Sequence, residues 1–310
     1  MKIVIVSPGR SNLDQWKNAL LESSPDLEVE VYPEDTDPDE TEFILTWNPP
    51  EGVFEHYPNL KVISSMGAGI NHILKHSDLP KDAVITKVND QNLKQDLSVF
   101  VLTLVLDHLR NMPLYFHQKQ QKVWTPSGYS RPRDKTVGII GVGAIGQEIG
   151  KVLVKNGFEV KGWSRSEKQL DSIECFHGSD QFNEFLSHCE IAICTLPLTN
   201  ETSGILDNKL FSKLPDGAYL INVGRGAHLV ENDLWEALDS GKLSGAALDV
   251  FDEEPLPEDH PFWEHPKISI TPHTASITDP VSISKTVAQN AKRLQRREKL
   301  LDTISVEKGY

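Results

Sequence analysis

The chain has 310 residues, enough for one large domain or two of ordinary size. Its apolar fraction of 38% and charged fraction of 25% indicate a globular protein and exclude collagen-like and disordered chains. With 31 Lys and Arg against 45 Asp and Glu, the net charge of −14 repels nucleic acids and anionic membrane surfaces, so we expect neither as a partner.

In chain order, five short β-branched runs come first, separated by helix-compatible stretches. A second series of six runs follows. This alternation predicts parallel sheets with crossover helices, that is, an α/β protein with doubly wound sheets. The runs of the first series are 2–6, 28–32, 43–47, 61–65 and 83–86, and those of the second are 137–140, 158–163, 191–196, 218–223, 245–250 and 268–271.

Two segments connect the series and the C-terminus. A helical pattern near 93–109 and a polar, proline-containing stretch at 112–133 are interpreted as the crossing between two domains. The last helix begins with Asp279 as N-cap and Pro280 at the first helical position, and it can return to the first domain. The predicted domains are a discontinuous one, 1–98 plus 283–310, and a second one, 99–282.

The three cysteines, Cys175, Cys189 and Cys194, do not have the spacing of a disulfide framework, which predicts a reducing, cytoplasmic location. Their spacing to nearby histidines fits no zinc pattern, so we expect no bound metal. The apolar runs 3–6 and 99–106 are too short for a signal-peptide core and a membrane span, respectively.

A glycine-rich turn follows the run 137–140 and precedes a helical run, 147–156. This order of strand, turn and helix is typical of a dinucleotide site, where the glycines allow a tight turn and close approach of the pyrophosphate to a helix N-terminus. The alternative is that these glycines only form a strand-to-helix turn and bind no ligand. The residues expected to bind the cofactor here are Gly141, Gly143, Ala144, Ile145 and Gly146.

The end of the next strand distinguishes the two nicotinamide cofactors. NAD sites usually carry an acidic residue there to bind the ribose 2′-hydroxyl, whereas this chain has Trp163, Ser164, Arg165 and Ser166. An Arg and two hydroxyls suit a 2′-phosphate. A solvated surface loop is the alternative. The sequence predicts that NADP(H) is preferred and that NAD(H) is possible.

Three further motifs lie at the carboxyl ends of predicted strands, where open α/β sheets bind ligands. Arg225, between two glycines, offers a planar cation for a carboxylate. His273 is a natural proton donor, and Glu254 is a candidate to bond its other ring nitrogen and fix its tautomer. Taken singly, each side chain has a structural alternative: a carbonyl-bonded Arg, a capping His and a solvated Glu.

Together these motifs resemble the D-isomer-specific 2-hydroxyacid dehydrogenase family over nearly the whole chain. The resemblance implies a Rossmann cofactor domain and a flavodoxin-like substrate domain enclosing a cleft, and a homodimer formed through the cofactor domain. It implies the catalytic set Arg225, Glu254 and His273, a nicotinamide carboxamide partner at Asp249, and further cofactor contacts from Leu196, Pro197, Val223 and Gly224. The motifs that carry it are 141–146, 196–199, 222–226, 249–255 and 272–273.

Within this family, the segments 46–50 and 65–71 are similar to the glyoxylate and hydroxypyruvate reductase A subgroup. The predicted reaction is NADPH-dependent reduction of a small 2-oxo acid to the 2-hydroxy acid, with Arg225 holding the carboxylate and His273 delivering the proton. The N–H groups near Gly67 and Gly69 are expected to form an anion nest. The predicted substrate-binding residues are Trp47, Met66, Gly67, Ala68, Gly69, Arg225 and His273.

Two alternatives stay open at this point. The chain is either another D-2-hydroxyacid dehydrogenase acting on a bulkier 2-oxo acid, or a cofactor-sensing interaction protein like the corepressors of this fold. Which 2-oxo acid is used depends on a pocket shape that the sequence does not specify. The physiological direction of the reaction is open as well.

Overall fold

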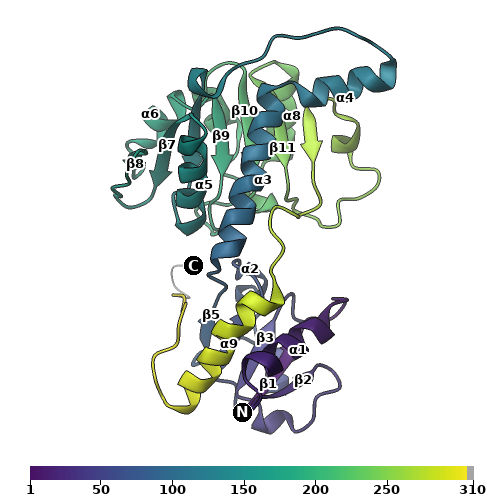
Figure 1. The fold of residues 1–310 in the computed structure, drawn as a ribbon, viewed down its shortest axis with the longest axis vertical. Helices are drawn as coiled ribbons and strands as arrows, with labels where there is room; N and C mark the ends of the chain where they lie inside the picture. The colour runs from purple at the N-terminus through teal and green to yellow at the C-terminus, as the bar shows by residue number, and fades with distance from the viewer. Residues whose placement is uncertain (306–310) are drawn as a thin grey trace. The chain divides into compact units, whose positions relative to one another are not determined.

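The computed structural model describes residues 1–305, and the chain divides into two compact units (Figure 1). Unit 1 comprises Met1–Leu93 and the tail from Ile277, and unit 2 comprises Lys94–Ser276. The predicted boundaries lie a few residues further along, at 98 compared with 93 and at 283 compared with 277. Residues 306–310 of the predicted tail lie outside the described residues.

Unit 1 contains a parallel five-stranded sheet in the order β2-β1-β3-β4-β5, which is the flavodoxin-like order. All five predicted runs form strands, and β1 and β3 are buried at every position because both faces of the sheet are covered. The strands are β1 (Lys2–Val6), β2 (Glu28–Val31), β3 (Phe43–Thr46), β4 (Val62–Ser65) and β5 (Val84–Thr86).

The helices of unit 1 include the predicted C-terminal one. The carboxylate of Asp279 accepts the N–H groups of Val281 and Ser282, both at 3.1 Å, so the predicted cap of α9 is confirmed. Helix α9 packs beside α1 (Figure 1). The helices are α1 (Leu13–Ser23), α2 (Asn71–Leu74) and α9 (Pro280–Gln295), with short 3₁₀ helices at Pro38–Glu40 and Val53–His56.

Unit 2 contains a parallel seven-stranded sheet in the order β12-β11-β10-β9-β6-β7-β8, which is the Rossmann order with one additional strand. The six predicted strands are present, and β8 is the one that sequence analysis missed. It pairs only with β7 at the sheet edge, and its four residues, of which only Phe176 is buried, form too short a run to indicate a strand. The strands are β6 (Thr136–Ile140), β7 (Glu159–Ser164), β8 (Glu174–His177), β9 (Ile191–Cys194), β10 (Ala218–Asn222), β11 (Leu243–Leu248) and β12 (Ile268–Ile270).

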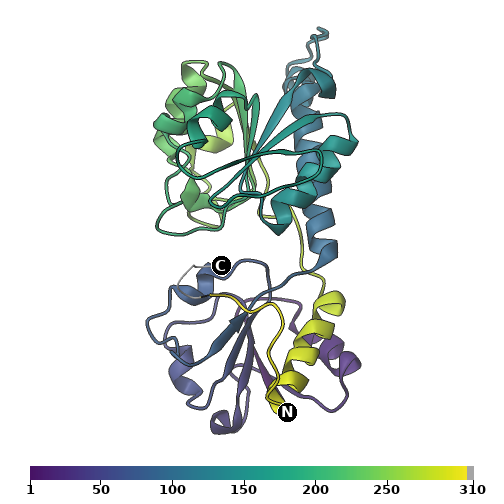
Figure 2. The same ribbon diagram turned by 90° about the vertical axis from the view of Figure 1, so that its left-hand side faces the viewer.

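Helices cover both faces of this sheet (Figure 2). Alternate strand residues such as Ile193 and Cys194 enter two different cores, one beneath α3 and α5 and the other beneath α6, α7 and α8. The helices are α3 (Gln91–Leu109), α4 (Met112–Gln121), α5 (Ala144–Lys155), α6 (Phe182–Ser187), α7 (Asn208–Lys213) and α8 (Glu231–Asp239), with 3₁₀ helices at Pro132–Asp134, Gly226–His228 and Pro261–Glu264.

The connection between the units differs from the predicted one. The stretch 112–133, interpreted as part of the crossing, lies within unit 2 and contains α4, whereas the boundary falls near the start of α3. Among the described residues, none of the helices by itself has the length and apolar character for a membrane span; α3 and α4 satisfy those criteria only as a pair bent by 60°.

Candidate active site

The glycine turn joins β6 to α5 at the point where the strand order reverses, between β6 and β9. Gly141 has φ +111°, a conformation that favours glycine, and its N–H donates to the carbonyl of Trp163 at 2.9 Å. A Cβ on Gly146 would overlap the carbonyl oxygen of Gly141, so glycine is required there for close packing of helix and strand. The roles predicted for these two glycines agree with their geometry.

Gly143 is different because a Cβ there would meet no atom within 4 Å. It is the N-cap of α5, and its extended backbone, φ −73° and ψ −163°, suits any residue. Neither strain nor packing therefore explains the glycine, whereas a ligand that approaches the N-terminus of α5 does. The residues of this turn fit a dinucleotide pyrophosphate.

The loop after β9 lies against the same turn. Thr195 donates its hydroxyl to the carbonyl of Gly141 at 2.7 Å, and the side chain of Leu196 lies 3.0 Å from where a Cβ on Gly141 would be. Pro197 is exposed next to them. Sequence analysis selected Leu196 and Pro197 but not Thr195, whose hydroxyl fixes the turn.

The four residues at the end of β7 have different surroundings. Trp163 donates its indole N–H to the carbonyl of Gly178 at 2.8 Å. Ser164 is buried, and its hydroxyl donates to the carbonyl of Ser166, also at 2.8 Å, which closes the loop. Arg165 is exposed and lies 3.4 Å from Glu201 in an ion pair. The guanidinium is therefore at the surface, whereas the Trp163 side chain is part of the packing.

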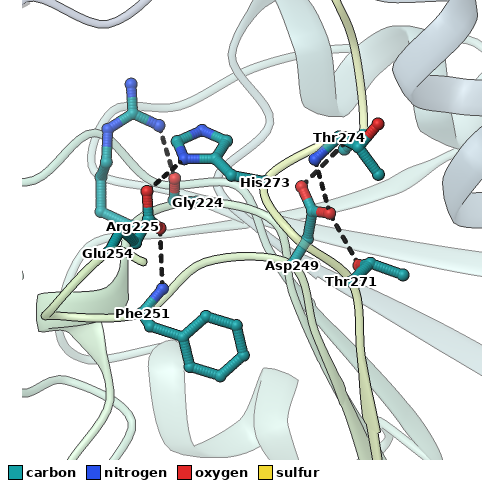
Figure 3. A network of polar contacts seen from close by, with 9 residues as sticks. Gly224, Arg225, Asp249, Phe251, Glu254, Thr271, His273 and Thr274 are labelled. Carbon is teal, nitrogen blue, oxygen red and sulfur yellow. Dashed lines mark hydrogen bonds and ion pairs between the residues drawn. The ribbon is translucent and has the colours of Figure 1, made fainter. Parts of the chain in front are cut away.

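Arg225 follows β10 in a loop held by buried polar groups. The Asn222 side chain, fully buried, accepts the N–H of Gly224 at 3.1 Å and donates to the carbonyl of Arg225 at 3.0 Å. The Arg225 guanidinium donates to the carbonyl of Gly224 at 2.6 Å (Figure 3). Burial lowers the pKa of Arg225, and the charge of Glu254 partly offsets this effect. Val223, which precedes the loop's two glycines, is buried.

Gly226 brings this loop against the segment that carries Glu254. A Cβ on Gly226 would overlap the backbone of Phe251, and the N–H of Phe251 donates to Glu254 Oε1 at 2.9 Å. Sequence analysis noted this glycine only as a neighbour of Arg225. Its close contact with the Phe251 backbone places the two loops side by side.

Glu254 and His273 form the predicted pair. The Oε2 atom of Glu254 lies 2.7 Å from Nδ1 of His273 (Figure 3). Burial raises the pKa of Glu254, but the hydrogen bonds from His273 and Phe251 and the positive charges of His273 and Arg225 lower it more, so the carboxylate form is favoured. The three predicted catalytic side chains are thus gathered at the carboxyl edge of the sheet of unit 2.

Asp249 supports the turn that carries His273. This buried carboxylate accepts the Thr271 hydroxyl at 2.7 Å and the N–H groups of Thr274 and Ala275, each at 3.0 Å (Figure 3). His273 has φ +48°, an uncommon value for a residue with a side chain, and its N–H donates to the carbonyl of Asp249 at 2.9 Å. Asp249 therefore holds the backbone of the turn that carries His273.

The substrate-binding residues predicted near the N-terminus lie in unit 1. The Trp47 ring packs over Gly67, where a Cβ would overlap it, and tilts against His72 with ring centres 4.3 Å apart. Ala68 and Gly69 are half-buried. Trp47 and this loop therefore form one local cluster.

Two expectations for this loop differ from the structure. Gly67 N–H donates to the Ser65 hydroxyl at 3.2 Å, and that hydroxyl donates to the carbonyl of Gly69 at 2.8 Å, so the Gly67 N–H closes the loop internally instead of forming an open nest. The Met66 side chain is fully buried, because it continues the alternation of β4 into the core and does not line a surface.

No metal-binding group of three or more His, Cys, Asp or Glu side chains occurs within residues 1–305. The residue that sequence analysis overlooked beside Arg225 is His228. It is fully buried, and its Nδ1 accepts the N–H of Arg225 at 3.0 Å. The position of His228 three residues after Arg225, in the same loop, was the signal in the sequence that could have indicated this contact.

With this geometry in place, comparison with known proteins assigns the class. Residues 102–275 match the D-isomer specific 2-hydroxyacid dehydrogenase, NAD binding domain, family. The chain belongs to the D-isomer specific 2-hydroxyacid dehydrogenase family.

Individual relatives are similar over nearly their full length. Glyoxylate/hydroxypyruvate reductase A of Photorhabdus laumondii is 37% identical over 301 residues, which cover 96% of each chain. A D-isomer specific 2-hydroxyacid dehydrogenase of Xanthobacter autotrophicus, solved with NADPH and MES, is 35% identical with a TM-score of 0.94 and covers 100% of this chain and 99% of its own. An NADPH-dependent glyoxylate/hydroxypyruvate reductase of Sinorhizobium meliloti, solved with NADP and sulfate, is 31% identical with a TM-score of 0.93 and the same coverage.

Proposed function

We propose that this protein reduces a small 2-oxo acid, glyoxylate or hydroxypyruvate, to the 2-hydroxy acid with NADPH. The observation that carries the proposal is the contact of 2.7 Å between Glu254 and His273, with the Arg225 guanidinium near enough for its charge to act on the same carboxylate. An acid group, its orienting carboxylate and a cation for the substrate carboxylate are the parts that this reduction requires.

Each of the three residues has a distinct role in this proposal. Arg225 binds the substrate carboxylate and polarises the carbonyl, because its planar guanidinium provides two parallel donors. His273 donates a proton to the carbonyl oxygen from Nε2, since Nδ1 is occupied by Glu254. Glu254 fixes the ring orientation and favours the imidazolium before transfer.

The cofactor would lie along the turn that contains Gly141, Gly143 and Gly146, with its pyrophosphate at the N-terminus of α5. When bound, it supplies the hydride. The exposed Arg165 would bind the 2′-phosphate, which supports a preference for NADP(H), with NAD(H) as a weaker alternative. Trp163 is a further candidate contact through its backbone. The other candidate cofactor contacts are Ala144, Ile145, Ser164, Ser166, Leu196, Pro197, Val223, Gly224 and Asp249.

Substrate contacts from Trp47, Ala68 and Gly69 remain part of the proposal on the strength of the sequence. An aromatic ring packed on a glycine loop offers a rigid wall for a small acid. Because Met66 is fully buried, we propose a contact only through its backbone.

We further infer a homodimer formed through unit 2. Along α4 and the segment after it, large apolar side chains are exposed, with Trp124 exposed at 99% and Phe116 and Tyr129 at more than half. Such a patch is typical of an interface. The free thiols Cys175, Cys189 and Cys194 support a cytoplasmic location.

The experiment that tests the activity measures kcat/KM for glyoxylate, hydroxypyruvate, pyruvate and phenylpyruvate with NADPH and with NADH. Replacement of His273 with Gln should lower kcat by about 10²- to 10⁴-fold without weakening NADPH binding. His188→Gln, at an exposed histidine of the same unit, is the matched control. Tight NADPH binding without turnover of any of the four acids would favour the cofactor-sensing alternative.

A further inference from the structure

The loop that carries Arg225 contains a second histidine, His228, that cannot reach a substrate because it is fully buried. Its Nδ1 accepts the backbone N–H of Arg225 at 3.0 Å, and its own N–H donates to the carbonyl of Arg225 at 3.2 Å. The side chain and backbone of His228 thus hold both polar groups of the Arg225 main chain.

The surroundings leave this imidazole little freedom. A Cβ on Gly224 would lie 2.9 Å from Nδ1, so the ring packs directly on that glycine, and Cys194 Sγ lies 3.8 Å from Nδ1. The carbonyl of His228 accepts the N–H of Leu206 at 2.8 Å, which anchors the residue to the neighbouring loop. Packing and hydrogen bonding therefore fix the position of Nδ1.

Only one protonation form suits this contact. A backbone N–H can only donate, so Nδ1 must be the acceptor, and the ring proton must reside on Nε2. Burial, together with the nearby charge of Arg225, lowers the pKa of His228 to about 4 against the opposing effect of the Pro197 and Arg225 backbones. The neutral form is thus the one present near neutral pH.

We propose that His228 is a positioning residue for the 2-oxo acid reduction, which places the Arg225 guanidinium by holding its backbone through Nδ1. The inference rests on the proposed function, because it assigns to Arg225 the substrate carboxylate. A small displacement of the Arg225 backbone is carried to the end of a long side chain, and misplacement of a binding group by about 1 Å can reduce catalysis by about 100-fold.

Two substitutions separate positioning from stability. In His228→Asn, the Oδ1 atom takes the place of Nδ1 relative to Cβ and can accept the Arg225 N–H. In His228→Gln, the side-chain amide lies one bond further away, at the place of Nε2, and leaves that N–H without its acceptor. The two variants are similarly polar, so their comparison reports on the position of the acceptor.

A matched control lies in the same unit. His265 is also buried, and its Nδ1 accepts the backbone N–H of Lys267 at 3.2 Å, at the amino end of β12 and therefore at the opposite edge of the sheet from the candidate site. His265→Gln removes an equivalent hydrogen bond where no substrate group is proposed. A change seen in both Gln variants would be an effect on stability.

The experiment measures KM and kcat for glyoxylate, the dissociation constants of NADPH and of oxamate, an unreactive analogue of a 2-oxo acid, and hydrogen exchange of peptides spanning 222–229. His228→Gln is expected to raise KM and the oxamate dissociation constant by about tenfold or more, and NADPH affinity is expected to change by less than about twofold. His228→Asn should stay within about threefold of the wild type, as should His265→Gln. Exchange of the Arg225 amide should be accelerated in His228→Gln only.

Equal KM values for the Asn and Gln variants, or a Gln effect confined to thermal stability, would overturn the inference. If the wild type reduces no 2-oxo acid, the proposed function fails instead, while the exchange comparison still reports on the Arg225 hydrogen bond. The outcomes of the two proposals are therefore distinguishable.

Discussion

Replacement of Gly143 with Ala should separate cofactor binding from folding. The added methyl group would meet no atom within 4 Å, and φ −73° is accessible to alanine. Alanine is a poorer N-cap than glycine by up to about 1 kcal/mol, whereas its lower entropy in the unfolded chain stabilises by about 0.4–1 kcal/mol. These effects nearly cancel, so the stability of the fold should change by less than about 1 kcal/mol.

Cofactor binding should change much more. The methyl group would fill the space beside the N-terminus of α5 in which we place the pyrophosphate, and would separate it from the backbone N–H groups there. Loss of one hydrogen bond to a charged group is worth about 1.5–3 kcal/mol, or about a 10- to 150-fold weaker dissociation constant for NADPH.

The assay combines thermal unfolding without ligand and calorimetric titration with NADPH. Gly128→Ala is the control, because a Cβ there also meets no atom within 4 Å and the residue lies in the segment after α4, away from the glycine turn. Wild-type NADPH affinity in Gly143→Ala would refute the placement of the pyrophosphate. A large loss of stability in this variant would show that packing, and not the ligand, requires the glycine.

Three further outcomes are expected. Gly146→Ala should lower the unfolding free energy by about 1–3 kcal/mol, because its Cβ would overlap the backbone of Gly141, and denaturant unfolding that matches the wild type would contradict this packing. Arg165→Ala should raise KM for NADPH by about 10- to 100-fold and leave KM for NADH nearly unchanged; equal changes for both cofactors would remove Arg165 from the 2′-phosphate site. Burial and the charge of Lys135 together lower the pKa of His108 from 6.5 to about 4. The neutral ring therefore stabilises the fold above about pH 6.5, and this contribution, about 3 kcal/mol, is lost as the pH falls towards 4. His108→Phe should keep the stacking on Tyr219, at 3.8 Å between ring centres, and reduce the decrease of the melting temperature over that pH range; an undiminished decrease would assign it to other groups.

The strands and the glycine turn could be predicted because their signals are local. Buried parallel strands need continuous apolar runs, and a tight turn before a helix needs glycines at set positions. Strand β8 and helix α4 were missed for a related reason. Strand β8 is a four-residue run at a sheet edge with one buried residue, Phe176, and α4 is only weakly amphipathic, so neither carries a periodic pattern strong enough to recognise.

For the candidate site, the sequence specified which residue types follow each strand, and so determined by itself the two sheets, the cofactor turn and the identity of Arg225, Glu254 and His273 as candidates. Only the tertiary structure decided which of their atoms meet: that Glu254 bonds Nδ1 of His273, that Met66 is buried, and that His228 holds the backbone of Arg225. The physical reason is that strand periodicity depends on near neighbours along the chain, whereas these contacts depend on loop backbones packed against one another. At Gly226 this packing is so close that one added methyl group would overlap the neighbouring backbone.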